Sequence, residues 1–285
     1  FSNFCEGPGV ATINEMRRFA GTTESSGAGP MEHGAFSVVI VTHNSAEALA
    51  ICLEFVMTLG CRVLIVDNGS SDDTIAICRE AGVEFVSNRD NLGFGAAANQ
   101  GLAFVDSDTV CILNPDCLLT APVVSAALAT LRDNPDSLVV PEFVDWEGRR
   151  HPGRQPGYTA LRLIADMLDG NGLAPLAKQL HRWTGPGDAT WHWPIGACIF
   201  ARRTALLGLG GFDPRYFCYM EDVQLGRVAY RKGHDVLLLP LPVPHFGGRG
   251  SMVEARRRQK LLNEARLTYA RVNYPAPFAF GLSLL

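Results

Sequence analysis

Short, largely apolar runs alternate with segments of helical periodicity through the first half of the chain. The run Phe36 to Thr42 is typical of a buried strand, and Ala46 to Thr58 shows the three-to-four-residue apolar spacing of a helix. The alternation continues with strands over 62–66, 84–87 and 109–113 and with helices over 72–81 and 93–105. Strands and helices that alternate in this way predict an α/β fold with a mostly parallel central sheet flanked by helices.

The second half of the chain is less regular. We expect strands over 138–140, 196–201 and 235–239, and helices over 122–133, 160–183, 221–232 and 251–272. Between them lies a polar loop over 145–158 that contains Arg149, Arg150 and Arg154, and loops of this length tend to be functional or mobile. Because no internal repeat divides the chain, we expect both halves to share one continuous sheet in a single domain.

Both ends of the chain differ from the region between them. Residues 1–34 are rich in Gly, Ser, Thr and Glu and lack periodicity, which predicts an extension that is disordered or foreign to the natural protein, with Met31 as a candidate natural start. They also lack the successive charged, apolar and cleavage-site regions of a secretory signal. The apolar tail Ala276 to Leu285 stops abruptly, and we expect it to be the cut edge of a longer chain.

The composition predicts a folded cytoplasmic protein. An apolar content of 47% over 285 residues is ample for a buried core, and a formal net charge of −4 gives no general attraction to nucleic acid. The eight cysteines form no CxxC pair and mostly lie in apolar runs, so we expect them to be reduced and structural. No run approaches the roughly 18 uninterrupted apolar residues that a membrane span needs.

A basic segment lies near the end of the chain. Between residues 249 and 271, seven basic side chains outnumber the two acidic ones, Glu254 and Glu264; the basic residues are Arg249, Arg256, Arg257, Arg258, Lys260, Arg266 and Arg271. A helix with such a face can make a peripheral contact with anionic lipid at the inner face of the plasma membrane, or with a lipid-diphosphate acceptor. A solvated helix face explains the same pattern equally well, so both interpretations stay open.

Carboxylates follow several of the apolar runs. Asp67 comes after the strand 62–66 and Asp116 after the strand 109–113, and the pair Glu221-Asp222 follows an aromatic run. Open α/β sheets bind ligands at the carboxyl ends of their strands. With His245 after the last strand, these groups supply ligands for one hard divalent cation and leave a carboxylate to act as a base. The sequence therefore predicts an enzyme that handles a phosphorylated donor.

Each candidate residue also has a structural explanation. Asp116 can cap the helix that follows it, Asp67 can belong to an Asn-Gly turn, and a lone histidine such as His245 is usually a core residue. Glu221 and Asp222 suit the first turn of a helix, which is compatible with catalysis because apolar surroundings raise a carboxyl pKa towards that of a general base.

Small residues dominate the segment Asn91 to Gly101 at the start of a predicted helix. They let a ligand approach the backbone closely, or let the helix pack tightly on the sheet. The segment matches neither GxGxxG nor GxxxxGKS/T, so dinucleotide and P-loop sites lose their main support.

Taken together and in order, these motifs resemble the family 2 inverting glycosyltransferases with the GT-A fold, especially bacterial rhamnosyltransferase-like members. The resemblance covers residues 36–274. The motifs that carry it are Ser37-Val38-Val39-Ile40-Val41-Thr42-His43-Asn44, Val66-Asp67-Asn68-Gly69-Ser70-Ser71-Asp72, Asn91-Leu92-Gly93-Phe94-Gly95 with Asn99-Gln100-Gly101, Leu113-Asn114-Pro115-Asp116, Gly196-Ala197-Cys198, Gly210-Gly211-Phe212-Asp213 and Tyr219-Met220-Glu221-Asp222-Val223.

The resemblance implies a role for each matched residue. Asp222 would be the catalytic base with Glu221 beside it, Asp67 would bind the nucleotide base, and Asp116 with His245 would hold Mg²⁺ or Mn²⁺. The other donor-binding residues would be Thr42, Asn44, Asn68, Asn91, Gly93, Asn99, Asn114 and Arg249. The residues near the acceptor would be Gly196, Tyr219, Trp193 and Trp191, with Arg149, Arg150 and Arg154 in an acceptor-side loop. Asn114 replaces the first Asp of a full DxD element and removes one negative charge from the metal site.

The resemblance also implies a division of labour and an activity. Residues 35–120 would bind the nucleotide sugar, 121–250 would bind the acceptor and catalyse, and 251–285 would form a basic helix and an apolar tail. The enzyme would move a sugar, rhamnose by the nearest resemblance, from a UDP or dTDP donor to a hydroxyl of a glycan or lipid-linked acceptor in cell-surface polysaccharide synthesis. The anomeric centre would invert.

Three other functions compete with this one. A sugar-phosphate nucleotidylyltransferase would need a Gly-rich, Arg-containing loop after the first strand, and Thr42-His43-Asn44-Ser45 is not such a loop. A nucleotide-sugar-binding protein without turnover would suit the Asn114 departure, although the intact Glu221-Asp222 pair argues against it. An extracellular carbohydrate-binding module fits poorly with the cysteines and the missing signal sequence.

Overall fold

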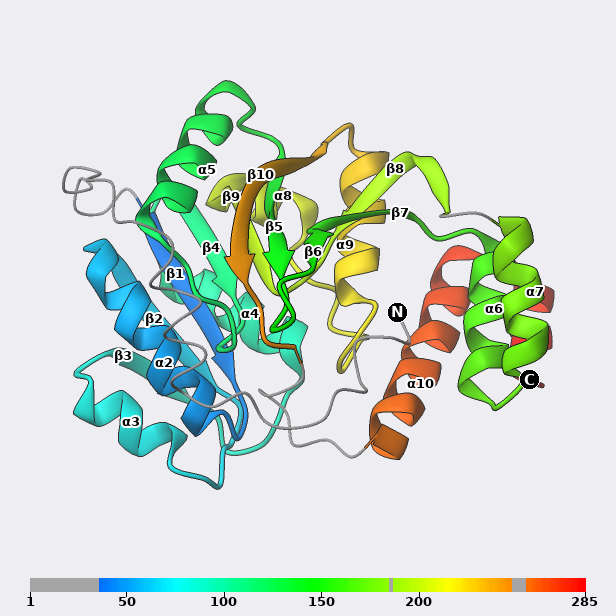
Figure 1. Cartoon of the computed structure of the whole chain (residues 1–285), viewed down its shortest axis with the longest axis horizontal. Helices are drawn as coiled ribbons and strands as arrows, with labels where there is room; N and C mark the ends of the chain where they lie inside the picture. Colours follow the sequence, from blue (N-terminus) through cyan, green and yellow to red (C-terminus); the bar gives the residue numbers. More distant parts are fainter. Residues whose placement is uncertain (1–35, 185–186, 248–254) are drawn as a thin grey trace.

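The computed structural model describes residues 36–184, 187–247 and 255–285 (Figure 1). The predictions for residues 1–34 and for Arg249 lie outside these ranges. In the first half the elements agree with the predicted ones to within a few residues. They are β1 (Phe36–Thr42), α2 (Ala46–Val56) with a short 3₁₀ turn (Met57–Leu59), β2 (Arg62–Asp67), α3 (Thr74–Glu80), β3 (Glu84–Ser87), α4 (Phe94–Phe104), β4 (Thr109–Leu113) and α5 (Ala121–Asp133).

The central sheet contains strands from both halves of the chain. Its order is β10-β5-β9-β4-β1-β2-β3, with β6 paired to β5, where β5 is Leu138–Val144, β6 Arg150–Pro152, β9 Cys198–Arg202 and β10 Val236–Pro244. The pairs β1–β2, β1–β4, β2–β3 and β10–β5 are parallel, whereas β9 is antiparallel to both of its neighbours, β4 and β5. The prediction of one mostly parallel α/β sheet, shared by both halves and flanked by helices, is confirmed.

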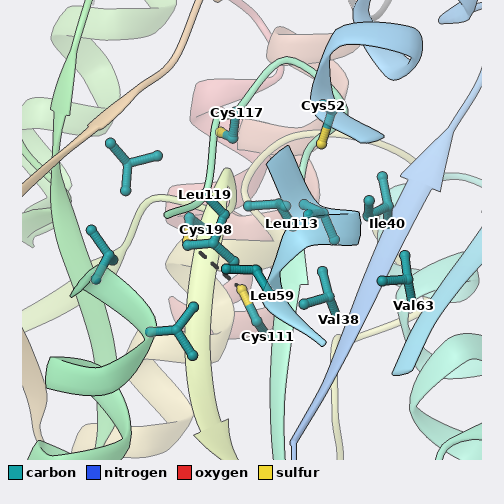
Figure 2. Packing of buried hydrophobic residues seen from close by; sticks show 14 of the residues in the cluster. Val38, Ile40, Cys52, Leu59, Val63, Cys111, Leu113, Cys117, Leu119 and Cys198 are labelled. Carbon is teal, nitrogen blue, oxygen red and sulfur yellow. Dashed lines mark hydrogen bonds between the residues drawn. The ribbon is translucent and has the colours of Figure 1, made fainter. Parts of the chain in front are cut away.

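Alternate residues of the strands feed two separate cores. From β1, Val38 and Ile40 face the core under α2 and α5, whereas Val39 and Val41 face the core under α4, α8 (Arg203–Leu209) and α9 (Glu221–Arg231). Figure 2 shows the first core, in which Cys111 and Cys198 lie beside these aliphatic side chains with their sulfurs 3.7 Å apart. All seven cysteines in the described ranges are free, as predicted, and Cys5 lies outside them.

The prediction of a polar loop over 145–158 is wrong, because this segment contains two strands. Asp145 Oδ1 accepts hydrogen bonds from the amides of Glu147 and Arg149, and the resulting turn folds β6 back on β5. The next strand, β7 (Arg154–Gly157), pairs with β8 (Asp188–Pro194) in a separate two-stranded sheet. β8 was not predicted, since its paired residues lie 31 to 40 positions earlier and the pairing leaves no local pattern.

The predicted helix over 160–183 is two helices, α6 (Ala160–Gly170) and α7 (Ala174–Thr184). The break comes at Gly172, whose φ of 82° lies in the left-handed region that favours glycine.

Two further short helices, α8 and α11 (Ala276–Leu282), were also not predicted. The last strand, β10, is longer than predicted because a register shift between Leu239 and Pro242 lets it continue past two prolines.

A layer of helices covers the end of the molecule away from β3. α6, α10 (Ala255–Asn273) and α11 meet β8 and the start of α9 in a third core that includes Leu163, Trp193, Val223 and Tyr269 (Figure 1). Of the helices in the described ranges, none is both long and apolar enough to cross a membrane.

Candidate active site

The sheet topology brings four strand ends to one edge. Because β1, β2, β4 and β10 run in the same direction, Thr42, Asp67, Asp116 and His245 all lie at or just past their carboxyl ends. The antiparallel strand β9 begins at this edge, so the preceding segment reaches it too, and the Asn114 amide donates to the Ala197 carbonyl over 2.8 Å. Carboxylates, an imidazole and backbone amides therefore gather where open α/β sheets bind ligands.

Asp116 and His245 form the group best suited to hold a cation. Among the described residues, the Oδ1 atom of Asp116 is buried without a hydrogen-bond partner, and His245 Nε2 lies 3.5 Å from it. The strand ends hold both residues in place, since the Phe246 amide donates to the Asp116 carbonyl over 3.1 Å. A buried carboxylate oxygen without a partner is costly, and a cation bound there would remove the cost.

Cys117 completes a three-residue group whose ligand atoms lie within 4.8 Å of one another. Its thiol, however, contacts the Ala197 carbonyl oxygen at 3.4 Å, and burial together with the charge of Asp116 raises its pKa well above the usual range. A neutral thiol is a poor ligand for a hard cation. The oxygen of Asp116 and the nitrogen of His245 remain, and this pair suits Mn²⁺ better than Mg²⁺.

The catalytic candidates Glu221 and Asp222 open α9 after a strained turn. Tyr219 and Met220 both adopt left-handed backbone conformations, with φ of 70° and 65°, which is unusual for residues other than glycine. This turn points the Asp222 side chain at the segment before β9, where Oδ2 accepts the Gly196 amide over 3.1 Å while Oδ1 accepts the Val223 amide over 2.8 Å. Asp222 is thereby fixed in position and stays partly exposed.

The surroundings of the two adjacent carboxyl groups give them different pKa values. Burial raises the pKa of Asp222 to about 6, and the two backbone amides act in the opposite direction. Burial and then the charge of Asp222 raise the pKa of Glu221 to about 8. Glu221 is only 6% exposed, and its Oε2 has no hydrogen-bond partner within residues 36–184, 187–247 and 255–285. Near neutral pH, Asp222 can accept a proton while Glu221 retains one.

The predicted donor residues at β1 and β2 are tied to one another. Asp67 is fully buried, and its carboxylate accepts from Thr42 Oγ1 over 3.0 Å and from both the amide and the hydroxyl of Ser70. The Asn44 amide donates to Ser70 Oγ over 2.8 Å. Asp67 thus fixes the turn around Ser70, and Thr42 and Asn44 line the same turn.

The segment 91–101 is shaped by packing. A Cβ at residue 93 would lie 2.2 Å from the Phe217 carbonyl oxygen, and a Cβ at residue 101 would lie 2.3 Å from the side chain of Val39. Asn91 Oδ1 accepts the amide of Gly93, and Asn68 Nδ2 donates to the Gly93 carbonyl. Helix-on-sheet packing therefore explains the glycine at 101, where Val39 belongs to β1, whereas Gly93 lies against the backbone of the segment that precedes α9.

Asn99, predicted to bind the donor, uses both of its polar groups on the backbone of Phe212. Its Oδ1 accepts the Phe212 amide over 2.8 Å and its Nδ2 donates to the Phe212 carbonyl over 2.7 Å. It holds the Gly210-Gly211-Phe212 turn against α4, and this structural role accounts for its amide without a ligand.

The predicted acceptor residues divide into two groups. Gly196 lies beside Asp222, and Tyr219 is partly exposed two residues before the carboxyl pair. Trp193, by contrast, is 4% exposed, and its Nε1 donates to the Pro156 carbonyl over 3.0 Å. The prediction that the Trp193 ring stacks on an acceptor sugar is wrong, because β8 packs that ring against α9. Trp191 is also buried and lies two residues earlier in β8.

The three arginines predicted on an acceptor-side loop have partners within the protein. Arg149 pairs with Asp145 at 2.7 Å, Arg150 with Glu142 at 3.2 Å, and Arg154 Nη1 donates to the Val236 carbonyl over 3.0 Å. They stabilise the strands around β5 and β10.

Sequence patterns did not reveal several residues at this edge. Ser70 was part of a quoted motif, but its bonds to Asp67 and Asn44 depend on the meeting of two strand ends. The paired amides of Asn88 and Gln100, 2.9 and 3.0 Å apart, join β3 to α4 in the same way. The adjacency of Cys117 to Asp116 was visible, yet its apolar surroundings favoured a core thiol.

Comparison with known proteins settles the family. A sequence model of glycosyl transferase family 2 matches residues 37–182, about half of the chain. The chain belongs to this family. One curated relative is the N-acetylglucosaminyl-diphospho-decaprenol L-rhamnosyltransferase of Mycobacterium tuberculosis. This family 2 chain is 32% identical to it over 189 residues, and the match covers 58% of this chain. The chain spans 59% of the length of that relative.

Solved structures support the fold of this family 2 chain. GalNAc-T7 with UDP, GalNAc and Mn²⁺ aligns with a TM-score of 0.57 at 15% identity, over 84% of this chain and 48% of that one. The mannosyltransferase PcManGT of Pyrobaculum calidifontis, in complex with GDP-Man and Mn²⁺, aligns with a TM-score of 0.54 at 17% identity, over 95% of this chain and 75% of that one. The GT-A fold predicted from the sequence is confirmed.

The raised pKa of Glu221 predicts a pH-dependent stability. The folded protein holds a proton on Glu221 that the unfolded chain releases near its ordinary pKa of 4.5, so folding stability falls as pH rises from about 4.5 to about 8. Replacing Glu221 by Gln removes this contribution, and the stability of Glu221→Gln relative to wild type should increase from pH 5 to pH 9. Urea unfolding at several pH values measures the difference.

A matched control for this measurement is Glu264→Gln on α10, where the carboxylate is 58% exposed. Its stability should follow wild type at every pH. If the difference in stability between wild type and Glu221→Gln stayed constant from pH 5 to pH 9, the pKa of Glu221 would not be raised, and the prediction would be wrong.

Proposed function

We propose that the protein is an inverting glycosyltransferase that moves a sugar from a nucleoside diphosphate to a hydroxyl of a glycan or lipid-linked acceptor. One observation carries the proposal: Asp222, fixed by the Gly196 and Val223 amides, opens a helix at the sheet edge that also holds Asp116 and His245. A base and a cation-binding pair at one edge are what a displacement at an anomeric carbon requires. Membership of family 2 supports the same activity.

The nucleotide-sugar half of the proposal assigns residues 35–120 to the donor. The turn fixed by Asp67 and Ser70 would border the nucleoside, with Thr42, Asn44 and Asn68 beside it. Asp67 can meet a base directly only if the turn opens, because its carboxylate is fully buried. Arg249, outside the described residues, is proposed as a further donor contact.

Asp116 and His245 would hold a divalent cation, Mn²⁺ or Mg²⁺, together with the donor diphosphate. Their fit to a cation rests on the buried Oδ1 of Asp116 that has no hydrogen-bond partner. Such a cation, when bound, offsets the charge that develops on the departing nucleoside diphosphate. Asn114 contributes no charge here, so this chain offers one carboxylate where a full DxD element would offer two. The presence of Mn²⁺ in the two similar structures is consistent with this assignment.

Asp222 would take the proton from the attacking acceptor hydroxyl. Its raised pKa of about 6 suits a base at neutral pH, and the two amides hold both carboxylate oxygens in a fixed orientation. The attacking oxygen approaches the anomeric carbon from the face opposite the diphosphate, so the configuration inverts. Glu221, kept protonated by burial, adds no second negative charge beside Asp222.

The finer assignment is a rhamnosyltransferase of cell-surface polysaccharide synthesis that uses a dTDP or UDP donor. It is supported by the 32% identity to a rhamnosyltransferase and by the matched motifs. We place the reaction in the cytoplasm, with peripheral contact to the inner membrane face through exposed basic residues of α10 such as Arg257, Lys260 and Arg271. Arg266 is excluded from that surface because it is 8% exposed and contacts Asp166. Co-sedimentation with anionic vesicles that decreases as salt increases is the expected behaviour.

Asp222→Asn tests the catalytic base. Asparagine preserves the shape of the side chain and removes its basicity, so release of the nucleoside diphosphate should slow by about 100- to 10,000-fold. Donor binding, measured by calorimetry, should change little. The control is Asp106→Asn, an exposed carboxylate paired with Arg62, which should retain wild-type turnover.

Turnover by Asp222→Asn within a few-fold of wild type would contradict the assignment of the base. Release of pyrophosphate in place of a nucleoside diphosphate would instead favour a nucleotidylyltransferase.

Thermal-shift screening tests the donor and the cation together. A ligand that binds only the folded state raises its apparent stability, so dTDP-rhamnose or a UDP-sugar should raise the midpoint more with Mn²⁺ than without it. His245→Ala should lose the Mn²⁺-dependent part of the shift, whereas His181→Ala on α7 should keep it. Equal shifts with and without Mn²⁺ in the wild type would contradict a cation held by Asp116 and His245.

A further inference from the structure

A cavity of about 330 Å³ lies beside the second half of α9, apart from the strand-end site. Its walls come from β8, from α9 and from the chain just before α6 and just after α10 (Figure 1). Arg227, which lines it, follows Asp222 by five residues and so lies about 7 to 8 Å farther along the helix axis. Of the described residues predicted for catalysis, donor or acceptor binding, only Trp191 lines this cavity.

Aromatic rings form one wall of the cavity. The rings of Trp191 and Tyr230 stack with their centroids 6.5 Å apart at an interplanar angle of 28°. Trp191 is buried, whereas Tyr230 is 50% exposed and lines the cavity. Tyr274 contributes a third ring from the end of α10. Such faces are suited to the apolar side of a ring-shaped ligand.

Arg227 supplies a hydrogen-bond donor that the protein leaves unused. Its guanidinium lies over the rings of Trp191 and Tyr274, each at 5.6 Å from the centroid, and Nη1 donates to the Tyr269 hydroxyl over 3.2 Å. The Nε atom is buried and has no hydrogen-bond partner in the part of the chain that the structure describes. A buried donor without a partner is costly in a folded protein, so an oxygen acceptor from a ligand would be favoured here.

Asp188 supplies an acceptor and balances the charge of the wall. Its Oδ1 is held by the amide and hydroxyl of Thr190 over 2.9 and 2.6 Å. The hydrogen bonds from Thr190 and, to a smaller extent, the hydrogen bond from the Trp191 side chain and the charge of Arg227 lower the pKa of Asp188, so the carboxylate stays ionised. The negative charge of Asp188 beside Arg227 would repel a phosphate group. The exposed Arg231, which also lines the cavity, does not remove that repulsion.

We infer that this cavity binds one sugar ring, stacked on Tyr230 and hydrogen-bonded through its hydroxyl groups to Arg227 and Asp188. Its volume is at the lower end of the roughly 300–1,000 Å³ typical of ligand pockets, which suits a single ring better than a nucleotide sugar. As far as the proposed glycosyltransferase function holds, the ring is a non-reacting unit of the acceptor glycan. Ring binding itself does not depend on that function.

Saturation-transfer NMR on the full chain tests the inference, without nucleotide or metal. The probes are the methyl glycosides of glucose, galactose, mannose, N-acetylglucosamine and rhamnose at millimolar concentration. At least one should bind, and Tyr230→Ala should weaken it about three- to tenfold, the factor expected when one aromatic contact is lost. Arg227→Lys, which removes Nε, should also weaken it.

The matched control is Phe104→Ala on α4, whose ring is 52% exposed and far along the chain from the cavity. It should bind as wild type does. If Arg227→Lys fails to fold by circular dichroism, the half-exposed Tyr230 still decides the result. Addition of UDP with Mn²⁺ should not displace the glycoside.

The inference would be overturned if no glycoside binds, if Tyr230→Ala binds as tightly as wild type, or if UDP displaces the probe, which would place it in the strand-end site. Displacement by inorganic pyrophosphate would also overturn it, in favour of an anion pocket. None of these results depends on turnover. Failure of the Asp222→Asn kinetic test would therefore leave the cavity intact, and failure here would leave the proposed transferase intact.

Discussion

The direction of one strand determines how the site is built. β9 is antiparallel to β4 and β5, so the segment that precedes it arrives at the edge where the parallel strands end. There the Gly196 amide donates to Asp222, and the next residue, Ala197, accepts the amide of Asn114, two residues before Asp116. Two hydrogen bonds on adjacent residues thereby connect the candidate base at the start of α9 to the candidate cation site after β4. If β9 ran parallel to its neighbours, Gly196 would lie at the opposite edge of the sheet.

Several polar groups and one turn at this edge destabilise the folded protein. Glu221 is buried with one oxygen unpartnered, Asp116 has another unpartnered oxygen, and the turn at Tyr219 and Met220 holds two residues in left-handed conformations. Strain and unpaired buried groups tend to gather at functional sites, because the surrounding structure must hold them in place. Here the α9 helix and the strand ends provide that support. The cavity beside Arg227 shows the same kind of unpaired group at a second location, with aromatic rings in place of carboxylates.

The sequence predicted what depends on local patterns. The strands and helices from β1 to α5, the carboxylates at the end of β2 and after β4 and the acids at the start of α9 all follow from apolar periodicity and from residues at strand or helix ends. The pairing of β7 with β8 joins residues 31 to 40 positions apart, so it was missed, and Trp193 was assigned to an acceptor although it is buried. The hydrogen bonds between Asn99 and Phe212 could not be predicted for the same reason, since the two residues lie 113 positions apart.

The central claim is that the Asp116–His245 pair and Asp222 serve one bound donor. The most direct test is a crystal structure of Asp222→Asn grown with Mn²⁺ and the nucleotide sugar that gives the largest thermal shift. The account predicts Mn²⁺ bound to Asp116 and His245, the diphosphate at the carboxyl ends of β1 and β4, and the side chain of residue 222 on the opposite side of the anomeric carbon. Mn²⁺ bound away from Asp116, or a donor sugar that lies out of reach of residue 222, would contradict it.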